Sequence, residues 1–399
     1  MTIPFSIAAL WLGLAVIATV IASYLRISMA LVEICVGMAA GAACEYYLGQ
    51  GLIGADAEWL RFLASSGAIL LTFLAGAELE PQVMRAKWKE VTVVGIVGFL
   101  APFAGCAALA HYLLGWSPQA SLLAGVALST TSMAVVYAVM LETGFNRTEF
   151  GKGILGACFV NDLGTVIALG LLFSPFTAKT LVFIAASAVF LAVLPRLSKR
   201  FTRKFGHRTA AIRAKWVMFT LFGLGALALW SGSEAVLPAY VAGIVLAEFA
   251  AKDELWIRRM RTLCIGFLTP FYFLRAGSLV SLPAIAAMPL VFLALLAGKV
   301  ASKIFGLYPF ISMFRKETNE RWYYTLMMST GLTFGTISAL YGLSHGIVGR
   351  EQYSFLVAGV IASAVIPTMI ANLAFIPYSL LPGTPEPTAE EIEEGPGNE

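Results

Sequence analysis

Hydrophobic positions along the chain fall in long continuous runs, not in the alternating pattern of half-buried strands. Most runs contain about 20 residues, which is the length a helix needs to cross a bilayer. Thirteen such segments span residues 3–24, 28–48, 60–77, 91–114, 119–142, 150–173, 178–195, 214–233, 236–250, 262–276, 283–306, 322–343 and 353–376. The pattern therefore predicts an all-α polytopic membrane protein with about thirteen transmembrane helices.

Composition supports a membrane protein and excludes several other classes. Of the 399 residues, 59% are hydrophobic and 13% are charged, whereas soluble domains are about half apolar and a quarter charged. The five cysteines lie in apolar runs without a Cys-x-x-Cys pair, and the three histidines do not cluster. We therefore expect no cofactor and no resident metal. The basic residues sit in short loops, so the net charge of +4 does not indicate nucleic-acid binding.

The distribution of lysine and arginine between loops predicts the orientation. Most of these residues lie in alternate loops, which should face the cytoplasm. The exceptions on the opposite side are Arg61, Lys179, Arg275 and Arg350. This places the N-terminus outside and the C-terminus in the cytoplasm of a cell whose inner (plasma) membrane holds the protein. Residues 377–399 are acidic and rich in proline and glycine, and we expect a disordered tail.

The basic connection at 196–215 divides the chain into two halves. Six segments precede the seventh and six follow it, which is the arrangement of two inverted-topology repeats. The fifth segment of each half carries a Ser/Thr cluster, "ALSTTSMAVV" (127–136) and "MMSTGLTFGT" (327–336). Hydroxyl groups can satisfy backbone groups where a helix breaks inside a membrane. The matched clusters predict two broken helices that cross at the midplane; the alternative is that small residues only allow close helix packing.

The segment "GACFVNDLGTVIALGLLF" (156–173) places Asn161 and Asp162 in the middle of an apolar run. A carboxylate at mid-bilayer costs about 2.5–3.5 kcal/mol on insertion scales, so it usually marks an ion or proton path. The fifth segment has hydroxyl groups at the same depth. The expected ion-binding residues are therefore Asp162, Asn161, Thr130, Thr131 and Ser132, with a dehydrated Na⁺ at Asp162 and Thr130. The second broken helix would be supported by Thr330, Gly331 and Thr333.

Three further charged residues lie inside predicted segments. Lys299 and Lys303 are four residues apart in the eleventh segment and should share one face of the helix. We expect Lys299 to be the charge partner of Asp162, with snorkelling as the alternative, and for Lys303 an extension to the cytoplasmic surface is preferred. The sequence leaves open which of the two is the core lysine. Glu33 is near the start of the second segment, and an interfacial position is expected for it.

Several stretches resemble the monovalent cation:proton antiporter-2 family, which includes Kef-type and NapA-type transporters. They are "LTFLAGAELEP" (71–81), "LTPFYFLRAGSLVSL" (268–282) and "FVNDLGTVIAL" (159–169). The chain departs from the family pattern at Ala77, Ala157, Arg275 and Ser281. Electrogenic relatives have two adjacent Asp residues where this chain has Asn161-Asp162, a pair typical of electroneutral members, whereas Kef-type members often have Gln-Asp.

The resemblance implies a two-part membrane domain over residues 1–376. A mobile core would comprise helices at about 91–173 and 283–376. A panel at about 3–77 and 214–276 would form a homodimer, and a linker helix at about 178–195 would join the two parts. The nucleotide-binding regulatory domain that follows the membrane part of Kef transporters is not expected here, so ligand gating of that kind is not expected either.

These features lead to one preferred function and two alternatives. The preferred function is Na⁺(Li⁺)/H⁺ antiport with elevator-type alternating access, in which the cation and the proton compete at Asp162. K⁺/H⁺ exchange or Kef-type K⁺ efflux is the close alternative, and a sodium-coupled organic-anion symporter is the third. An intramembrane enzyme is not expected, because Asp162 is the only Asp well inside any segment and no His lies at depth. Asn161 favours an electroneutral cycle, whereas Lys299 leaves an electrogenic one open.

Overall fold

The computed structural model of the chain describes residues 3–25, 29–47, 54–77, 87–145, 148–173, 177–205, 212–233, 235–251 and 254–381. Within these ranges every regular element is helical. The elements are α1 (Ile3–Leu25), α2 (Met29–Tyr47), α3 (Glu58–Ala77), α5 (Trp88–Ala108), η1 (Leu109–Leu113), α6 (Pro118–Ser129), α7 (Met133–Thr143), α8 (Glu149–Phe173), α9 (Ala178–Phe205), α10 (Ile212–Trp230), α11 (Val236–Ala251), α12 (Glu254–Leu263), η3 (Cys264–Leu268), α13 (Thr269–Ser278), α14 (Leu282–Ala287), α15 (Pro289–Ile311), α16 (Thr318–Met328), α17 (Thr333–Ser344), α18 (Arg350–Ala374) and η4 (Tyr378–Leu380).

Each of the thirteen predicted segments corresponds to a helix or to a run of consecutive helices, so the predicted all-α polytopic fold is confirmed. In the described part of the chain, 9 runs have the length and apolar character of a membrane span. The remaining predicted segments are α2, α11, the pair α6–α7, and the run from α12 through η3 to α13. The chain is therefore a multi-pass membrane protein.

Some boundaries differ from the sequence prediction. Helix α9 continues through Pro195 to Phe205, although a basic connection was predicted from residue 196. Contacts with α10 support this extension, because Trp216 Nε1 donates to Ser198 Oγ at 3.0 Å and the Trp216 ring stacks on Phe201. Residues 378–380 of the predicted tail form a short 3₁₀ helix, and residues 382–399 lie outside the described residues.

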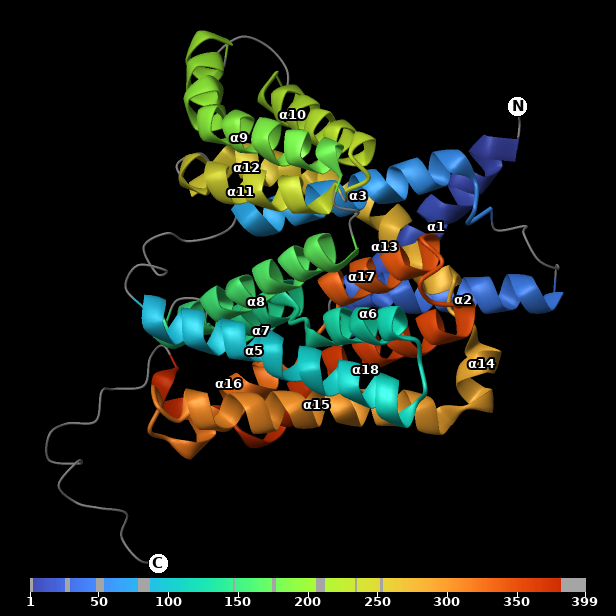
Figure 1. The fold of residues 1–399 in the computed structure, drawn as a ribbon, viewed down its shortest axis with the longest axis vertical. Coiled ribbons are helices and arrows are strands. Elements are labelled where there is room, and N and C mark those ends of the chain that lie inside the picture. Colours follow the sequence, from blue (N-terminus) through green and yellow to red (C-terminus); the bar gives the residue numbers. More distant parts are fainter. Residues whose placement is uncertain are drawn as a thin grey trace, which may run out of the picture.

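The helices pack in two sets. We name α5–α8 with α15–α18 the core set, and α1–α3 with α10–α13 the panel set. Within the core set, α5 packs on α6, α8 and α15, and α15 packs on α16 and α18. Within the panel set, α2 lies along α13 and α3 lies along α11. Figure 1 shows α5–α8 and α15–α18 in the lower part of the view, with α9–α12 and α3 in the upper part.

Glycines bring the helix pairs of the panel set into backbone contact. A Cβ added at Gly41 of α2 would lie 2.7 Å from the Ser278 carbonyl oxygen of α13. A Cβ at Gly243 of α11 would lie 2.9 Å from Ala77 N of α3. In the two repeats α2 corresponds to α11, and α3 corresponds to α13. The α2–α13 pair of helices is therefore the repeat counterpart of the α11–α3 pair, as inverted repeats require. The small residues thus allow the same close approach at both equivalent places.

Candidate cation site

Two broken helices meet in the middle of the core set, as predicted. Helix α6 ends at Ser129 and α7 begins at Met133, and the residue that follows α6, Thr130, is extended with φ −63° and ψ 151°. Helix α16 ends at Met328 and α17 begins at Thr333, which is 8% exposed. These two interruptions expose backbone groups that a continuous helix would pair internally.

Hydroxyl groups satisfy several of these backbone groups. Thr131 Oγ1 donates to the Met328 carbonyl oxygen at 2.9 Å, and Ser132 N donates to Thr330 Oγ1 at 3.4 Å, so each break supports the other. Thr330 Oγ1 in turn donates to the Met327 carbonyl oxygen at 2.8 Å. The Ser132 hydroxyl accepts from Val135 N and caps α7. Thr131, Ser132 and Thr330, three of the residues predicted from the sequence, therefore support the crossing in this structure.

Asp162 and Asn161 of α8 lie beside this crossing and are 2% and 0% exposed. Thr131 N donates to Asn161 Oδ1 at 3.0 Å, so Asn161 holds the first break in place. Asn161 Nδ2 and Asp162 Oδ1 are buried and have no hydrogen-bond partner in the protein. Buried polar atoms normally have partners. An unpartnered carboxylate oxygen at this depth is a group suited to a proton or a cation ligand.

Both lysines of α15 point at the first break. The buried residues of this helix form one stripe at four-residue spacing: Leu295, Lys299, Lys303, Leu307 and Ile311. Lys299 Nζ donates to the Thr130 carbonyl oxygen at 3.3 Å, and Lys303 Nζ donates to Thr131 Oγ1 at 3.0 Å. Lys303 is 0% exposed, so the prediction that it extends to the cytoplasmic surface is wrong. The stripe continues to Ile311, which keeps Lys303 on the buried face.

The predicted ion pair between Lys299 and Asp162 is also not formed in this structure. Within the described part of the chain, no ion pair joins Asp162 to either lysine. The reason is that the Lys299 ammonium is held at the end of α6.

Gly331 provides the space for the Lys299 ammonium. A Cβ added at Gly331 would collide with Lys299 Nζ and would lie 3.1 Å from both the carbonyl and the hydroxyl oxygen of Thr130. The second break therefore contains a glycine because the lysine head passes directly over its backbone. The Thr130 hydroxyl itself donates to the Ala127 carbonyl oxygen at 3.1 Å. A cation bound by the Thr130 or Thr131 oxygens would thus replace an ammonium group.

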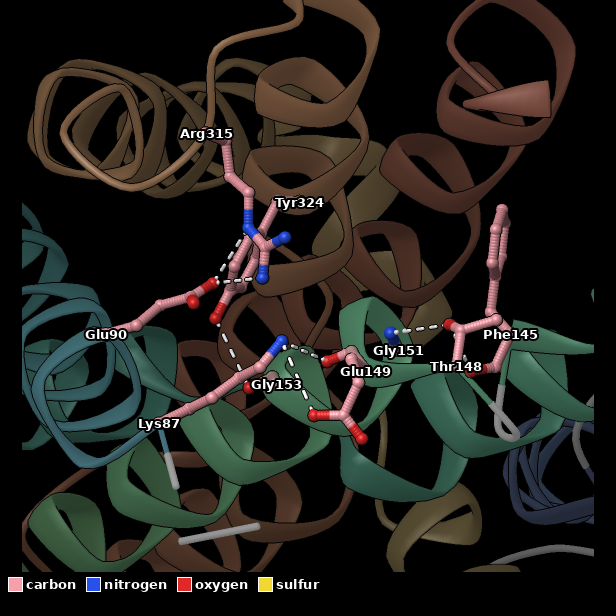
Figure 2. Close-up of polar contacts among 9 residues, drawn as sticks. All are labelled: Lys87, Glu90, Phe145, Thr148, Glu149, Gly151, Gly153, Arg315 and Tyr324. Carbon is pink, nitrogen blue, oxygen red and sulfur yellow. Dashed lines mark hydrogen bonds and ion pairs between the residues drawn. The ribbon is translucent and has the colours of Figure 1, made fainter. Parts of the chain in front are cut away.

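A second charged cluster lies where α5 and α8 begin (Figure 2). Arg315, in the connection between α15 and α16, donates from Nε and Nη2 to Glu90 Oε1 at 3.0 and 2.7 Å. The Arg315 guanidinium also lies 5.0 Å from the centroid of the Phe150 ring. The side chains of Arg315 and Glu90 are only 14% and 11% exposed. This pair connects the first-half core helices to the second-half ones.

Lys87 and Tyr324 extend the same cluster. Lys87 Nζ donates to the Glu149 carbonyl oxygen at 2.9 Å and lies 3.8 Å from its carboxylate. Tyr324 OH donates to the Gly153 carbonyl oxygen at 3.3 Å. Burial and then the neighbouring Arg315 guanidinium lower the pKa of Lys87, against the opposing effects of Glu90 and Glu149. Lys87, Glu149 and Arg315 come from loops and helix ends that the sequence assigned to one side of the membrane.

Two charged residues of the panel set are buried. Glu33 of α2 is 1% exposed and its Oε1 has no partner, so it is buried in the protein and not interfacial. Arg275 of α13 donates from Nε to the Ala55 carbonyl oxygen at 2.7 Å and lies 3.8 Å from Asp56. Asp56 also pairs with Arg61 at 2.9 Å. The unusual Arg275 therefore has a local acidic partner near the start of α3.

Sequence reasoning missed Lys303 as part of the crossing and did not find the Glu90–Arg315 pair. The four-residue stripe of α15 is a signal that was available for Lys303, because it continues past the lysine with Leu307 and Ile311. Glu90 and Arg315 are 225 positions apart in sequence, and no local pattern relates them.

Comparison with known proteins gives consistent matches. The profile of a family described as "Sodium/hydrogen exchanger, transmembrane" matches residues 12–375. A relative named "Probable Na(+)/H(+) antiporter 3" from Methanocaldococcus jannaschii is 26% identical over 351 residues, which cover 82% of this chain and 87% of the relative. The "Glutathione-regulated potassium-efflux system protein KefC" of Escherichia coli (strain K12) is 24% identical over 397 residues. That match covers 93% of this chain but 62% of KefC, so the chain spans about three-fifths of that protein.

Solved structures show the same fold. The sodium proton antiporter MjNhaP1 from Methanocaldococcus jannaschii at pH 8 matches with a TM-score of 0.69. The match covers 93% of this chain and 97% of that chain, at 14% sequence identity. At this identity the likeness concerns the fold.

Proposed function

The chain belongs to the sodium/hydrogen exchanger family of cation/proton antiporters, and we propose that it exchanges Na⁺ or Li⁺ for H⁺ through competition at Asp162. The observation that carries this proposal is the buried Asp162 oxygen without a partner, beside two crossed broken helices. A protonated Asp162 is neutral and tolerates burial, whereas an ionised Asp162 needs a nearby cation. One carboxyl group cannot hold both ligands, so binding of one releases the other.

The two lysines take part in this competition because their ammonium groups bind oxygens of the first break, where a cation would bind. Lys299 and Lys303 now bind the Thr130 carbonyl and the Thr131 hydroxyl. A cation that reaches these oxygens and Asp162 must displace at least one ammonium group. We propose Thr130 and Thr131 as cation ligands, with Asn161 and Ser132 holding the first break, and Thr330, Gly331 and Thr333 shaping the second. Lys299 and Lys303 then stabilise the break while no cation is bound.

Transport itself would follow an elevator-type cycle. The core set would move against the panel set and would carry Asp162 between the two sides of the membrane, while α9 links the sets. The panel sets of two subunits would form a homodimer. The positive-inside pattern supports a plasma-membrane protein with its N-terminus outside.

K⁺/H⁺ exchange is the second candidate, because the match to KefC covers 93% of this chain. Selectivity depends on the size and oxygen geometry of the occupied site. In one experiment, proton movement in proteoliposomes is recorded on addition of Na⁺, Li⁺ or K⁺. We expect Na⁺ and Li⁺ to release protons, and a response to K⁺ alone would instead support the second candidate.

The variant that tests the site is Asp162→Asn, which keeps the shape of the side chain but removes its titration. We expect no cation-driven proton movement in this variant. The matched control is Asp56→Asn, because Asp56 is a carboxylate with a 74% exposed side chain that pairs with Arg61 and Arg275 and not with residues of the crossing. Exchange by Asp162→Asn at the rate of the unmodified protein would refute the proposed site.

Charge movement tests the stoichiometry. One carboxyl group that exchanges one Na⁺ for one H⁺ moves no net charge, and Asn161 replaces the second carboxylate of electrogenic relatives. An electrogenic cycle would be driven by about 2.3 kcal/mol per charge per 100 mV. We expect no sustained current on a solid-supported membrane. A sustained current that disappears in Lys299→Gln while exchange continues would make Lys299 a proton carrier.

A further inference from the structure

Tyr240 of α11 is a panel-set side chain that reaches into the core set. It is 1% exposed, and its hydroxyl donates to the Phe159 carbonyl oxygen of α8 at 3.2 Å. Its ring stacks on Phe159 with centroids 5.4 Å apart, and it meets the ring of Phe334 in α17 edge-on at 5.7 Å. The phenol is therefore inserted between two core helices, and α11 on α8 is a place where the two sets pack together.

This contact lies beside the ion site. Phe159 comes shortly before Asp162 in α8, and Phe334 follows Thr333 directly after the second break. Phe159 and Asp162 are three residues apart in α8 and therefore lie on neighbouring turns of the same helix face. Asp162 is 2% exposed. Tyr240 thus packs on the turn of α8 that leads to Asp162, on the side that faces the panel set.

The backbone that carries Tyr240 is held tightly in the panel set. The Tyr240 carbonyl oxygen lies against Gly76 of α3, and Gly243, one turn later in α11, lies against the Phe73 carbonyl oxygen. Close backbone packing of this kind leaves α11 little freedom to shift relative to α3. The ring is therefore mounted on a rigid helix pair, and the core set has to move if the contact is to open.

We propose that Tyr240 is the gate residue that closes access to Asp162 in this conformation. It acts by positioning: the ring packs against Phe159 and Phe334 next to the turn that carries Asp162, and the hydroxyl holds α8 in place. This inference rests on the alternating access proposed above. In each cycle α8 and α17 slide away from the ring, the hydrogen bond to Phe159 breaks, and water and the cation reach Asp162.

Cys158 provides a reporter that does not depend on transport. It is fully buried, one helical turn before Asp162, with its sulfur 3.6 Å from the Met328 sulfur. In a background with Cys35, Cys44, Cys106 and Cys264 replaced by Ala, Cys158 is the only thiol. The rate of its reaction with 2-aminoethyl methanethiosulfonate in proteoliposomes measures how often the site opens.

Tyr240→Ala should increase the labelling rate of Cys158 at least about tenfold, because it removes both the ring and the hydrogen bond. Tyr240→Phe keeps the ring and loses one hydrogen bond, so the increase should be about 2- to 12-fold and below that of the Ala variant. The control is Phe73→Ala, a fully buried ring of α3 that contacts Trp256 within the panel set. It should change the rate less than about twofold.

Ion coupling gives a second readout. In Tyr240→Ala, Na⁺ flux should exceed the matched H⁺ flux, whereas Tyr240→Phe should keep the ratio of the unmodified protein. The gate is refuted if Tyr240→Ala and Phe73→Ala label Cys158 equally fast, or if Tyr240→Phe labels as fast as Tyr240→Ala. The labelling assay involves no transport, so it tests the gate independently of the proposed function. Failure of the proposed function would appear instead as exchange that continues in Asp162→Asn.

Discussion

Removing the Glu90 carboxylate should destabilise the protein much more than removing an exposed charge of similar contact distance. Glu90 accepts two hydrogen bonds from Arg315, the shorter at 2.7 Å. The side chains of Glu90 and Arg315 are only 11% and 14% exposed. Breaking a buried pair by removing one partner costs about 3–5 kcal/mol, because the other charge stays buried without compensation. Because both side chains keep some exposure to solvent, we expect a loss of unfolding free energy at the lower end of this range, about 3 kcal/mol.

The structure also predicts an asymmetry between the two partners. Glu90 is an anion that faces both Arg315 and Lys87, so Glu90→Gln leaves two cations close together. Arg315→Met leaves Glu90 with Lys87 nearby, and its cost should be smaller. The double variant should lose less than the sum of the two single losses, because the partners are in direct contact.

Equilibrium unfolding in mixed detergent micelles, followed by tryptophan fluorescence, measures these differences in the free energy of unfolding. The matched control is Arg61→Gln, which removes an ion pair of 2.9 Å between side chains that are 55% and 74% exposed. Exposed pairs contribute about 0.2–1 kcal/mol. If Glu90→Gln costs no more than Arg61→Gln, or if the double variant loses the full sum, then the buried pair does not clamp the two halves of the core set.

Three further predictions concern the crossing. Gly331→Ala should push the Lys299 ammonium off the Thr130 carbonyl oxygen and lower the exchange rate at least about tenfold, whereas Gly223→Ala, with nothing within 4 Å of the added Cβ, should leave the rate unchanged. Thr131→Val should weaken apparent Na⁺ affinity by about tenfold with a smaller effect on maximal rate, and Thr131→Ser should restore it; an unchanged Na⁺ dependence would exclude Thr131 as a ligand. Lys303→Met should reduce exchange in proteoliposomes as strongly as Lys299→Met does, and full activity would contradict its burial beside Thr131.

The spans and the candidate carboxylate could be predicted from local sequence because each depends on one segment. A run of about 20 apolar residues needs a bilayer whatever surrounds it. A single Asp in such a run is costly in any arrangement, so Asp162 was identifiable without coordinates. The two breaks were predicted because equivalent segments of the two halves carry similar Ser/Thr clusters, and they occur at residues 130–132 and 329–332.

The partners of each polar group were decided by the tertiary structure. Lys299 and Lys303 bond oxygens that lie 169 and 172 positions away in sequence. Their spacing shows that they share a face, but the rotation of α15 about its axis comes from packing on α5 and α18. Because the sequence does not contain this rotation, the surface position predicted for Lys303 was wrong, and the structure buries the residue.

The Glu90–Arg315 pair and the insertion of Tyr240 between α8 and α17 were likewise decided by tertiary packing. Hydrophobic periodicity and composition determined which segments enter the membrane and which residue is too polar to be there without a role. Which side chain packs on the helix turn that leads to that residue, and which oxygens the neighbouring lysines bind, depends on contacts between segments such as α8 and α11. Those contacts follow from how helices are rotated and packed, because a hydrogen bond needs its atoms within about 3 Å, and sequence order does not encode that distance.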